Sequence, residues 1–229
     1  MALERMNAKR IHEMDMMKLQ FYTNISHELR TPLTLISAPL ETLQSEKVKK
    51  EKRSEYYQLM HKNVQRLRRL INQLLDMRKI EEGHLKMEWT QGDVIEFVRR
   101  IVTNFESYAE KRKIQLTFHS AADQLRTFFD ADKLDKVIFN LLSNAFKYTP
   151  DKGQITVYFT NGGNHQDGTY KKEAENDYYE IRIEDSGIGI PSESQRNIFK
   201  PFHQVKKNKP IGSAGSGIGL SHAKQLIDL

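Results

Sequence analysis

The sequence contains no cysteine, which excludes disulfide bridges and every reaction that needs a thiolate. It also lacks any apolar run of the roughly 18 residues that a membrane-spanning helix requires. The segment from Met1 to Leu19 is mixed and charged throughout, so it does not resemble a signal peptide. What is present is a chain of 229 residues, 38% hydrophobic and 29% charged, which is long enough for one large domain or two modest ones.

Basic residues outnumber acidic ones and give a net charge of +6, but they are scattered along the chain. Local clusters occur at Lys47–Arg53, Arg66–Arg69 and Lys206–Lys209. Because nucleic-acid binding usually needs one continuous basic surface, we expect no nucleic acid to bind this part of the protein. An anionic ligand or an acidic partner surface would use the same charge.

The first third of the chain has a helical pattern with one interruption. Apolar residues recur every three or four positions from Leu3 to about Glu82, and a charged run from Glu46 to Glu55 divides the pattern. Two amphipathic helices joined by a polar turn form a hairpin, which cannot cover its own apolar stripe. We therefore predict that two copies form a dimeric four-helix bundle, and that residues 1–20 extend the first helix as a coiled coil. The predicted seam consists of Leu33, Ile36, Leu40, Leu43, Met60, Val64, Leu67, Ile71 and Leu74.

A second domain of α+β type is predicted after the segment Leu85–Gln91. Gly83 is typical of the position just after a helix, so the hairpin domain would comprise residues 21–85 and the second domain residues 90–229. From Ser186 to Gly219, glycine-bearing turns dominate. Before them, the pattern predicts a helix capped by Asp93 and running to about Lys111, strands at Ile114–Phe118 and Thr127–Phe129, a helix from about Asp132 to Lys147, and strands at Gln154–Thr160 and Tyr178–Ile183.

A histidine on the first predicted helix stands in a setting that suits chemistry. Apolar residues at positions 25, 29 and 33 would face inward and turn His27 and Glu28 toward solvent. An exposed imidazole beside a carboxylate can act as a nucleophile, because the acid takes or orients the proton on one ring nitrogen and leaves a lone pair on the other. Pro32 should bend the helix just below His27, and the Thr31 hydroxyl could hold a water there. The other seven histidines lack such a setting and are interpreted as structural or solvated.

The predicted helix that ends near Lys147 carries polar residues on one face. Asn140, Asn144 and Lys147 stand at positions i, i+4 and i+7. Two amide oxygens and an ammonium group suit a magnesium ion bound to a triphosphate, because oxygen ligands hold the metal and the cation meets phosphate. Taken alone, the same pattern is equally typical of a solvent-exposed stripe.

Three further motifs follow in order. In the segment Glu184–Pro191, two glycines come directly after a strand, and Asp185 can accept a hydrogen bond from an exocyclic amine such as that of adenine. The segment Ile198–Phe202 holds an aromatic pair that could anchor a mobile flap or fill a gap in a core. The segment Gly212–Leu220 leads into a helix whose first N–H groups suit phosphate, and residues 206–215 are predicted to form a flexible lid.

Together these motifs resemble those of the sensor histidine kinases of two-component systems. SHELRTP, NLLSNAFKYTP, EDSGIGIP, FKPF and GSGIGL are similar to the H, N, G1, F and G2 boxes of that family, over about residues 10–229. The resemblance implies a dimerisation and histidine-phosphotransfer hairpin, followed by an α/β sandwich of the Bergerat type that binds ATP and Mg²⁺. It also implies a homodimer that autophosphorylates and then passes the phosphoryl group to a response-regulator receiver domain, which is separate or, as in hybrid kinases, fused.

The resemblance further implies roles for individual residues. His27 would accept the phosphoryl group, Glu28 would be the general base, and Thr31 would assist a phosphatase reaction on the regulator. Asn140 and Asn144 would meet the metal and the phosphates, and Asn144 is the better candidate for a metal ligand. The other nucleotide contacts expected from the resemblance are Lys147, Tyr148, Asp185, Gly187, Gly189, Gly215, Gly217, Gly219 and Leu220.

The resemblance stops before the end of the family pattern. The family continues past the GSGIGL helix with a turn and two strands, whereas this sequence ends at Leu229, so we expect an ATP-binding domain truncated at its C-terminus. Membrane attachment would come from an upstream region, as in the cytoplasmic portion of a bacterial sensor anchored in the inner membrane. Two alternatives are a different ATPase on the same nucleotide fold, which would lack the SHELRTP hairpin, and a scaffold whose nucleotide domain has degenerated, although every motif is intact here.

Overall fold

The computed structural model describes residues 2–44, 49–162, 178–201, 203 and 217–229. They divide into two compact units, one formed mainly by Met1–Leu85 and the other mainly by Lys86–Phe199 and Gly219–Leu229. Among the described helices, none combines the length and the apolarity that crossing a membrane requires.

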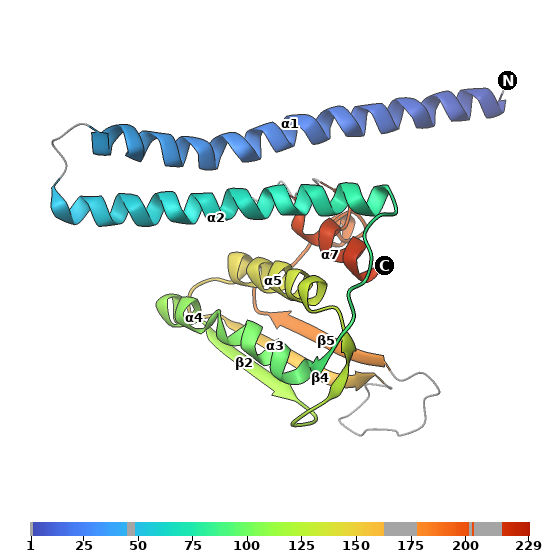
Figure 1. Ribbon diagram of the computed structural model, residues 1–229. Coiled ribbons are helices and arrows are strands. Elements are labelled where there is room, and N and C mark those ends of the chain that lie inside the picture. Colours follow the sequence, from blue (N-terminus) through green and yellow to red (C-terminus); the bar gives the residue numbers. More distant parts are fainter. Residues whose placement is uncertain (1, 45–48, 163–177, 202, 204–216) are drawn as a thin grey trace. The chain divides into compact units, whose positions relative to one another are not determined.

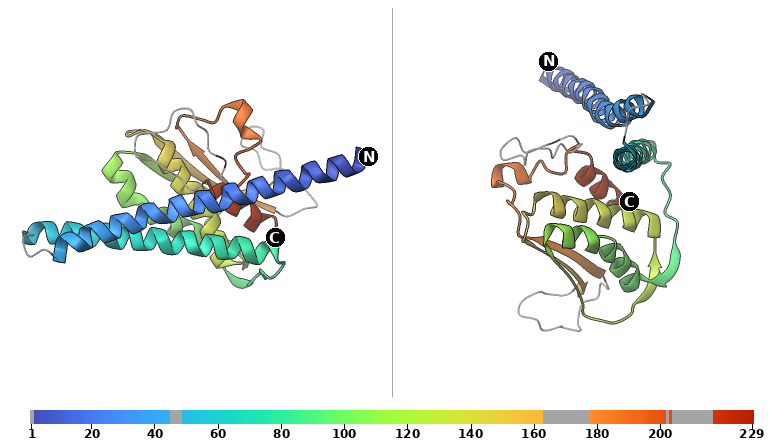
Figure 2. Two further views of the ribbon diagram at one scale, coloured as in Figure 1. Left: turned by 90° about the horizontal axis from the view of Figure 1, so that it is seen from above. Right: turned by 90° about the vertical axis from the view of Figure 1, so that its left-hand side faces the viewer.

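Two long helices form the first unit and lie side by side as an antiparallel hairpin (Figure 1). Helix α1 spans Ala2–Gln44 and α2 spans Lys50–Glu81. Much of the charged run expected in the turn therefore already belongs to α2. Glu82 caps α2, and Gly83 follows with a φ of +67°, which agrees with the predicted helix end. Figure 2 shows that the two helices cross at an angle.

The apolar stripe of the hairpin is only partly covered within one copy of the chain. Ile25 and Leu29 are half-buried, as expected, but Leu33 is 55% exposed, so the prediction that it faces inward is wrong for the single chain. Other seam residues, among them Leu40, Val64 and Ile71, are also exposed. A lone hairpin therefore leaves part of its stripe in water. Most of the predicted coiled-coil side chains of residues 1–20 lie outside the described part.

The second unit is an α/β sandwich whose helices cover one face of a three-stranded sheet (Figures 1 and 2). Strand β2 (Gln115–Ser120) pairs in parallel with β4 (Gln154–Gly162), and β4 pairs antiparallel with β5 (Tyr178–Asp185). Helices α3 (Val94–Thr103) and α5 (Ala131–Tyr148) pack on this sheet. The core between the layers contains Val98, Leu142, Ile155 and Val157, none of which has an exposed side chain.

A second, two-stranded sheet is not predicted by the sequence. Strand β1 (Thr90–Asp93) pairs antiparallel with β3 (Arg126–Phe129). The sequence of β1, TQGD, has no apolar alternation and so gives no strand signal. Among its described residues, the unit also contains the short helices α6 (Ser192–Gln195), which is likewise absent from the sequence prediction, and α7 (Gly219–Ile227).

The helix expected from Asp93 to Lys111 is two helices. Helix α3 ends at Thr103, and α4 spans Glu106–Arg112. Between them lies Phe105, a buried residue whose ring contacts the rings of Phe139 and Phe146 at centroid distances of 5.3 Å. We infer that burial of the Phe105 ring stabilises the fold more than the helical hydrogen bonds that are lost at the break.

Asp93 caps α3 and is predicted to make the unit sensitive to acid. Its carboxylate accepts hydrogen bonds from the backbone N–H groups of Leu125, Glu96 and Ile95, and these bonds, that of Leu125 first, lower the pKa of Asp93. The resulting stability is present at neutral pH and is lost as the pH falls through the lowered pKa. We expect Asp93→Ala to lower the melting temperature at neutral pH, by an amount that shrinks in acid. Thermal unfolding of the variant and the wild type at neutral and at acidic pH measures this. A difference in melting temperature that is the same at both would contradict the prediction.

Candidate functional site

His27 is exposed on α1, but its neighbour Glu28 does not face solvent freely. The Glu28 side chain is 14% exposed and accepts a hydrogen bond at 3.0 Å from Nη2 of Arg66 on α2. The prediction that Glu28 points to solvent is therefore wrong. Arg66 belongs to this group of residues, although in the sequence it is only one member of a basic cluster. The ion pair fixes the carboxylate between the two helices, one residue along the chain from the imidazole.

Backbone hydrogen bonding in α1 is altered next to His27. Pro32 and Pro39 are buried within the helix and have no N–H group to donate. On the exposed surface, the Thr31 hydroxyl donates to the His27 carbonyl at 3.3 Å, and the Thr34 hydroxyl donates to the Arg30 carbonyl at 3.1 Å. The helix nevertheless continues to its end (Figure 1). The Thr31 hydroxyl proton is thus engaged, while the oxygen can still accept a hydrogen bond.

A buried ion pair fixes the start of α5, the helix with the predicted polar face. Lys133 Nζ donates to the carboxylate of Asp130 and, at 2.8 Å, to the carbonyl of Lys86. The same carboxylate accepts hydrogen bonds from the backbone N–H groups of Lys133 and Glu88, at 3.0 and 2.7 Å. The side chains of Asp130 and Lys133 are only 2% and 8% exposed. These contacts fix the N-terminal end of the helix that carries the polar residues.

The middle of the polar face lies against the start of α7. A β-carbon built on Gly219 would lie 3.5 Å from Asn140 Oδ1 and 4.0 Å from Asn144 Nδ2. His222 of α7 is completely buried, and its Nδ1 lies 3.5 Å from Asn140 Nδ2. Two motifs that are separated by about eighty residues of sequence thus meet at Asn140. His222 is part of these surroundings, which its position in the sequence does not reveal.

The C-terminal end of α5 lies against the loop that follows β5. The Gly187 N–H donates to the Asp185 carboxylate at 2.9 Å, and the Ile188 N–H donates to the Tyr148 carbonyl at 3.4 Å. The ammonium group of Lys147 lies 5.0 Å from the centroid of the Tyr148 ring. Asp185 is exposed and therefore accessible to a ligand. The structure brings four predicted nucleotide contacts together at this end of α5.

For the remaining predicted nucleotide contacts, the structure gives the backbone conformation or the burial. Gly189 and Gly217 have positive φ values of +67° and +68°, and Leu220 is half-buried at the start of α7. Phe199 is 46% exposed, so the alternative in which it fills a core gap is wrong. Gly215, Phe202 and the predicted lid at 206–215 lie outside the described residues.

The amide side chains suit a metal ion that arrives with phosphate. In the part of the chain that the structure describes, no group of three or more His, Cys, Asp and Glu side chains is arranged to hold a metal. Asn140 and Asn144 offer neutral oxygens on one face of α5. Because Mg²⁺ keeps several waters and binds substrate phosphates through few protein ligands, this donor set fits Mg²⁺ bound to a triphosphate.

Comparisons with known proteins agree with these arrangements. Residues 17–83 match the His Kinase A (phospho-acceptor) domain, and residues 129–229 match the histidine kinase-, DNA gyrase B- and HSP90-like ATPase domain. The whole chain aligns at 37% identity with histidine kinase P4 of Formosa agariphila, of which it spans 16%. This chain is therefore similar to a small part of that relative.

Two solved structures have the same fold at lower identity. Histidine kinase AdeS of Acinetobacter baumannii has a TM-score of 0.61 at 21% identity, over 88% of this chain and 86% of that one. Histidine kinase ThkA in complex with response regulator protein TrrA has a TM-score of 0.53 at 23% identity, over 88% and 54% of the two chains. With a phospho-acceptor hairpin and a histidine-kinase-type ATPase unit in this order, the chain belongs to the sensor histidine kinases of two-component systems.

Proposed function

We propose that this chain phosphorylates itself on His27 with ATP and passes the phosphoryl group to an aspartate of a response-regulator receiver domain. The observation that carries the proposal is the pairing of an exposed histidine beside Glu28 on a helical hairpin with a second unit whose polar residues converge along α5. The match to a phospho-acceptor domain supports the first part, and the match to an ATPase domain supports the second. ThkA, which has the same fold, forms a complex with a response regulator.

The nucleotide is proposed to lie along α5. Asp185 would accept a hydrogen bond from the exocyclic amine of adenine, and Lys147 would meet a phosphate. Asn140 and Asn144 lie next to the start of α7, where the first N–H groups of the helix favour a negative charge. Mg²⁺ held by these asparagines would neutralise charge that develops on the transferred phosphoryl group.

The phosphoryl transfer needs a nucleophile and a proton acceptor from the hairpin. The imidazole nitrogen of His27 that carries a lone pair would form a bond to the γ-phosphorus, while the bond from that phosphorus to the bridging oxygen breaks and ADP leaves. Glu28 would take the proton from the other ring nitrogen. The Glu28–Arg66 pair keeps the carboxylate within this region of the hairpin. Thr31 would serve a later phosphatase step on the regulator.

The active form is proposed to be a homodimer. Leu33, Leu40, Val64 and Ile71 are all at least 40% exposed in the single chain. Apolar side chains in a stripe of this length are stabilised when a second hairpin covers them. Two hairpins packed along this stripe would form the predicted four-helix bundle.

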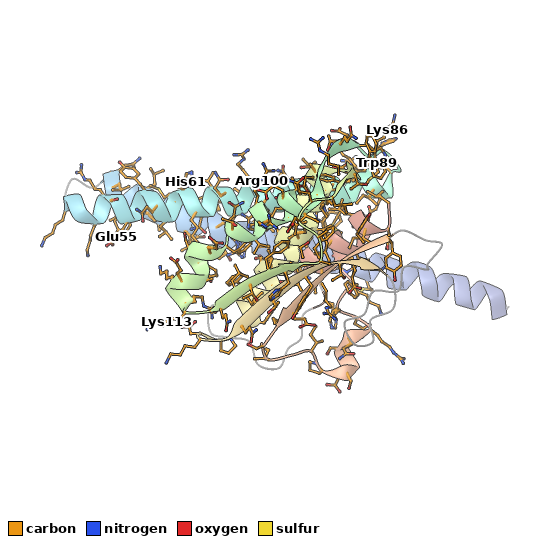
Figure 3. All side chains as sticks on the ribbon, turned by 90° about the horizontal axis from the view of Figure 1, so that it is seen from below. Glu55, His61, Lys86, Trp89, Arg100 and Lys113 are labelled. Carbon is orange, nitrogen blue, oxygen red and sulfur yellow. The ribbon has the colours of Figure 1, made fainter. Side chains whose placement is uncertain are left out.

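The test is incubation of the protein with γ-labelled ATP, followed by acid and alkali treatment of the labelled chain. We expect acid-labile label on the wild type, no label on His27→Ala, and little on Asn144→Ala. His61, an exposed histidine of α2 (Figure 3), offers the matched control, and His61→Ala should be labelled like the wild type. Label that survives His27→Ala would refute the assignment of the acceptor. An unlabelled wild type would favour a scaffold.

A further inference from the structure

One arginine outside the predicted site binds the end of α5. Arg112, the last residue of α4, is 22% exposed, and its guanidinium donates from all three nitrogens. Nη1 donates to the Phe146 carbonyl, Nη2 to the Thr149 carbonyl at 2.8 Å, and Nε to the Asp151 carboxylate at 2.7 Å. Carbonyl groups at a helix C-terminus have no partner within the helix, so the arginine satisfies acceptors that the helix leaves open.

The backbone of Arg112 is engaged by the same turn. The Lys152 N–H donates to the Arg112 carbonyl at 3.1 Å. The turn after α5 is therefore held both by the side chain and by the main chain of one residue. The neighbouring Lys113 behaves differently, because its side chain is exposed and points away from the fold (Figure 3).

The turn after α5 also supports the loop that carries Asp185. The Ser186 N–H donates to the Gln154 carbonyl at 3.0 Å, and the Gln154 N–H donates to Ser186 Oγ at 2.8 Å. Gly153 leaves no free space in between, since a β-carbon there would lie 2.4 Å from Thr149 Cγ2 and 2.9 Å from Ser186 Oγ. A displacement of the turn would therefore move Ser186 and, with it, Asp185.

A second connection runs through Tyr148, which lies between the two residues whose carbonyls Arg112 binds. The Tyr148 carbonyl accepts the hydrogen bond from the Ile188 N–H. Gly187 packs so closely on this carbonyl that a β-carbon would lie 2.7 Å from the oxygen. Arg112 thus fixes both of the supports on which the loop with Asp185 rests.

We propose that Arg112 is a positioning residue for nucleotide binding, which holds the end of α5 and the following turn so that Asp185 stands where it can meet the adenine base. This inference rests on the proposed ATP site. Arg112 itself touches neither the nucleotide nor the metal. Arg112 acts at the end of the site that is proposed to hold the adenine base, which ATP and ADP share. Its loss therefore weakens the binding of both nucleotides. The rate of autophosphorylation at saturating ATP is set by groups elsewhere and changes little.

The experiment compares Arg112→Met and Arg112→Lys with the wild-type chain by calorimetric titration with ATP and ADP, and by the ATP dependence of autophosphorylation. For Arg112→Met we expect Kd for both nucleotides, and KM for ATP, to rise about tenfold with kcat nearly unchanged. Arg112→Lys should recover part of the affinity, because one ammonium group cannot reproduce the planar fork of the guanidinium. Lys113→Met removes the adjacent exposed charge and should keep the wild-type Kd.

Loss of stability must be separated from loss of position. Val98→Ala, which empties space in the core under α3, should lower the melting temperature without changing Kd for ATP. An unchanged Kd in Arg112→Met, or an equal rise in Val98→Ala, overturns the inference. If Arg112→Met does not fold, an unchanged KM in Arg112→Lys overturns it. A wild-type chain that binds no ATP overturns the proposed function as well, whereas the other outcomes leave that function standing.

Discussion

Replacing Gly187 by alanine is expected to weaken ATP binding by about one to two orders of magnitude. The new β-carbon would lie 2.5 Å from Asp185 Oδ1 and 2.7 Å from the Tyr148 carbonyl oxygen. Neither group can simply move aside, because both take part in the hydrogen bonds that hold this loop. Forcing an atom into such a packed site costs about 1–3 kcal/mol. The loop would shift and carry Asp185 away from its proposed place beside the adenine base. Calorimetric titration with ATP would measure the loss of affinity.

Gly189 in the same loop provides a matched comparison. Its φ of +67° is unfavourable for alanine, at a cost of about 1–2 kcal/mol, but no atom of the described residues lies within 4 Å of a β-carbon there. We therefore expect Gly189→Ala to lower the melting temperature, with a much smaller effect on Kd than Gly187→Ala. Equal losses of affinity in the two variants would mean that the close approach at Gly187 is not what the site requires.

Lys133→Met is expected to destabilise the second unit by about 3–5 kcal/mol. The substitution leaves the Asp130 carboxylate buried without its cation and removes the donor to the Lys86 carbonyl. Urea unfolding followed by circular dichroism would measure the change. Adding Asp130→Asn to Lys133→Met removes the unpaired charge, so the double variant should be more stable than Lys133→Met alone. The opposite order would contradict this explanation.

The same ion pair should make the effect of Lys133→Met depend on pH. Burial by itself raises the pKa of Asp130, but the hydrogen bonds from the Lys133 side chain and from the backbone of Glu88 and Lys133 lower it overall. A carboxyl with a lowered pKa stabilises the native state at neutral pH, and this stability is lost as the pH falls through that pKa. In Lys133→Met, protonation of Asp130 removes the unpaired buried charge and so stabilises the folded variant. The difference in unfolding free energy should therefore shrink on acidification, and a constant difference would refute the assigned role.

Elements with local signals could be predicted from the sequence, and elements decided by packing could not. Helix α5 has a capping aspartate and a regular apolar period, and β4 has a clear alternation, so the predicted bounds of both are nearly correct. Strand β1 has no alternation and exists because β3 offers it a partner. The break before α4 depends on the place of Phe105 in the core, which no pattern within the helix reveals.

The candidate site follows the same division. Helical spacing predicts which side chains of α5 share a face, and the motifs predict which loops should approach it. No spacing predicts that Arg66 pairs with Glu28, that Arg112 binds the far end of α5, or that His222 is buried beside Asn140. Each of these contacts joins residues that are more than thirty positions apart, and only the folded chain brings them together.

The prolines and hydroxyls near His27 have a mechanical consequence. Pro32 and Pro39 remove N–H donors from the buried side of α1, and the hydroxyls of Thr31 and Thr34 share backbone carbonyls on the exposed side. A helix bends at the lowest cost where its hydrogen-bond ladder is weakest. A twist or displacement imposed on the upstream part of α1 would therefore be absorbed as curvature around His27, the proposed phosphoacceptor. In this stretch α1 should bend more easily than in the rest of its length.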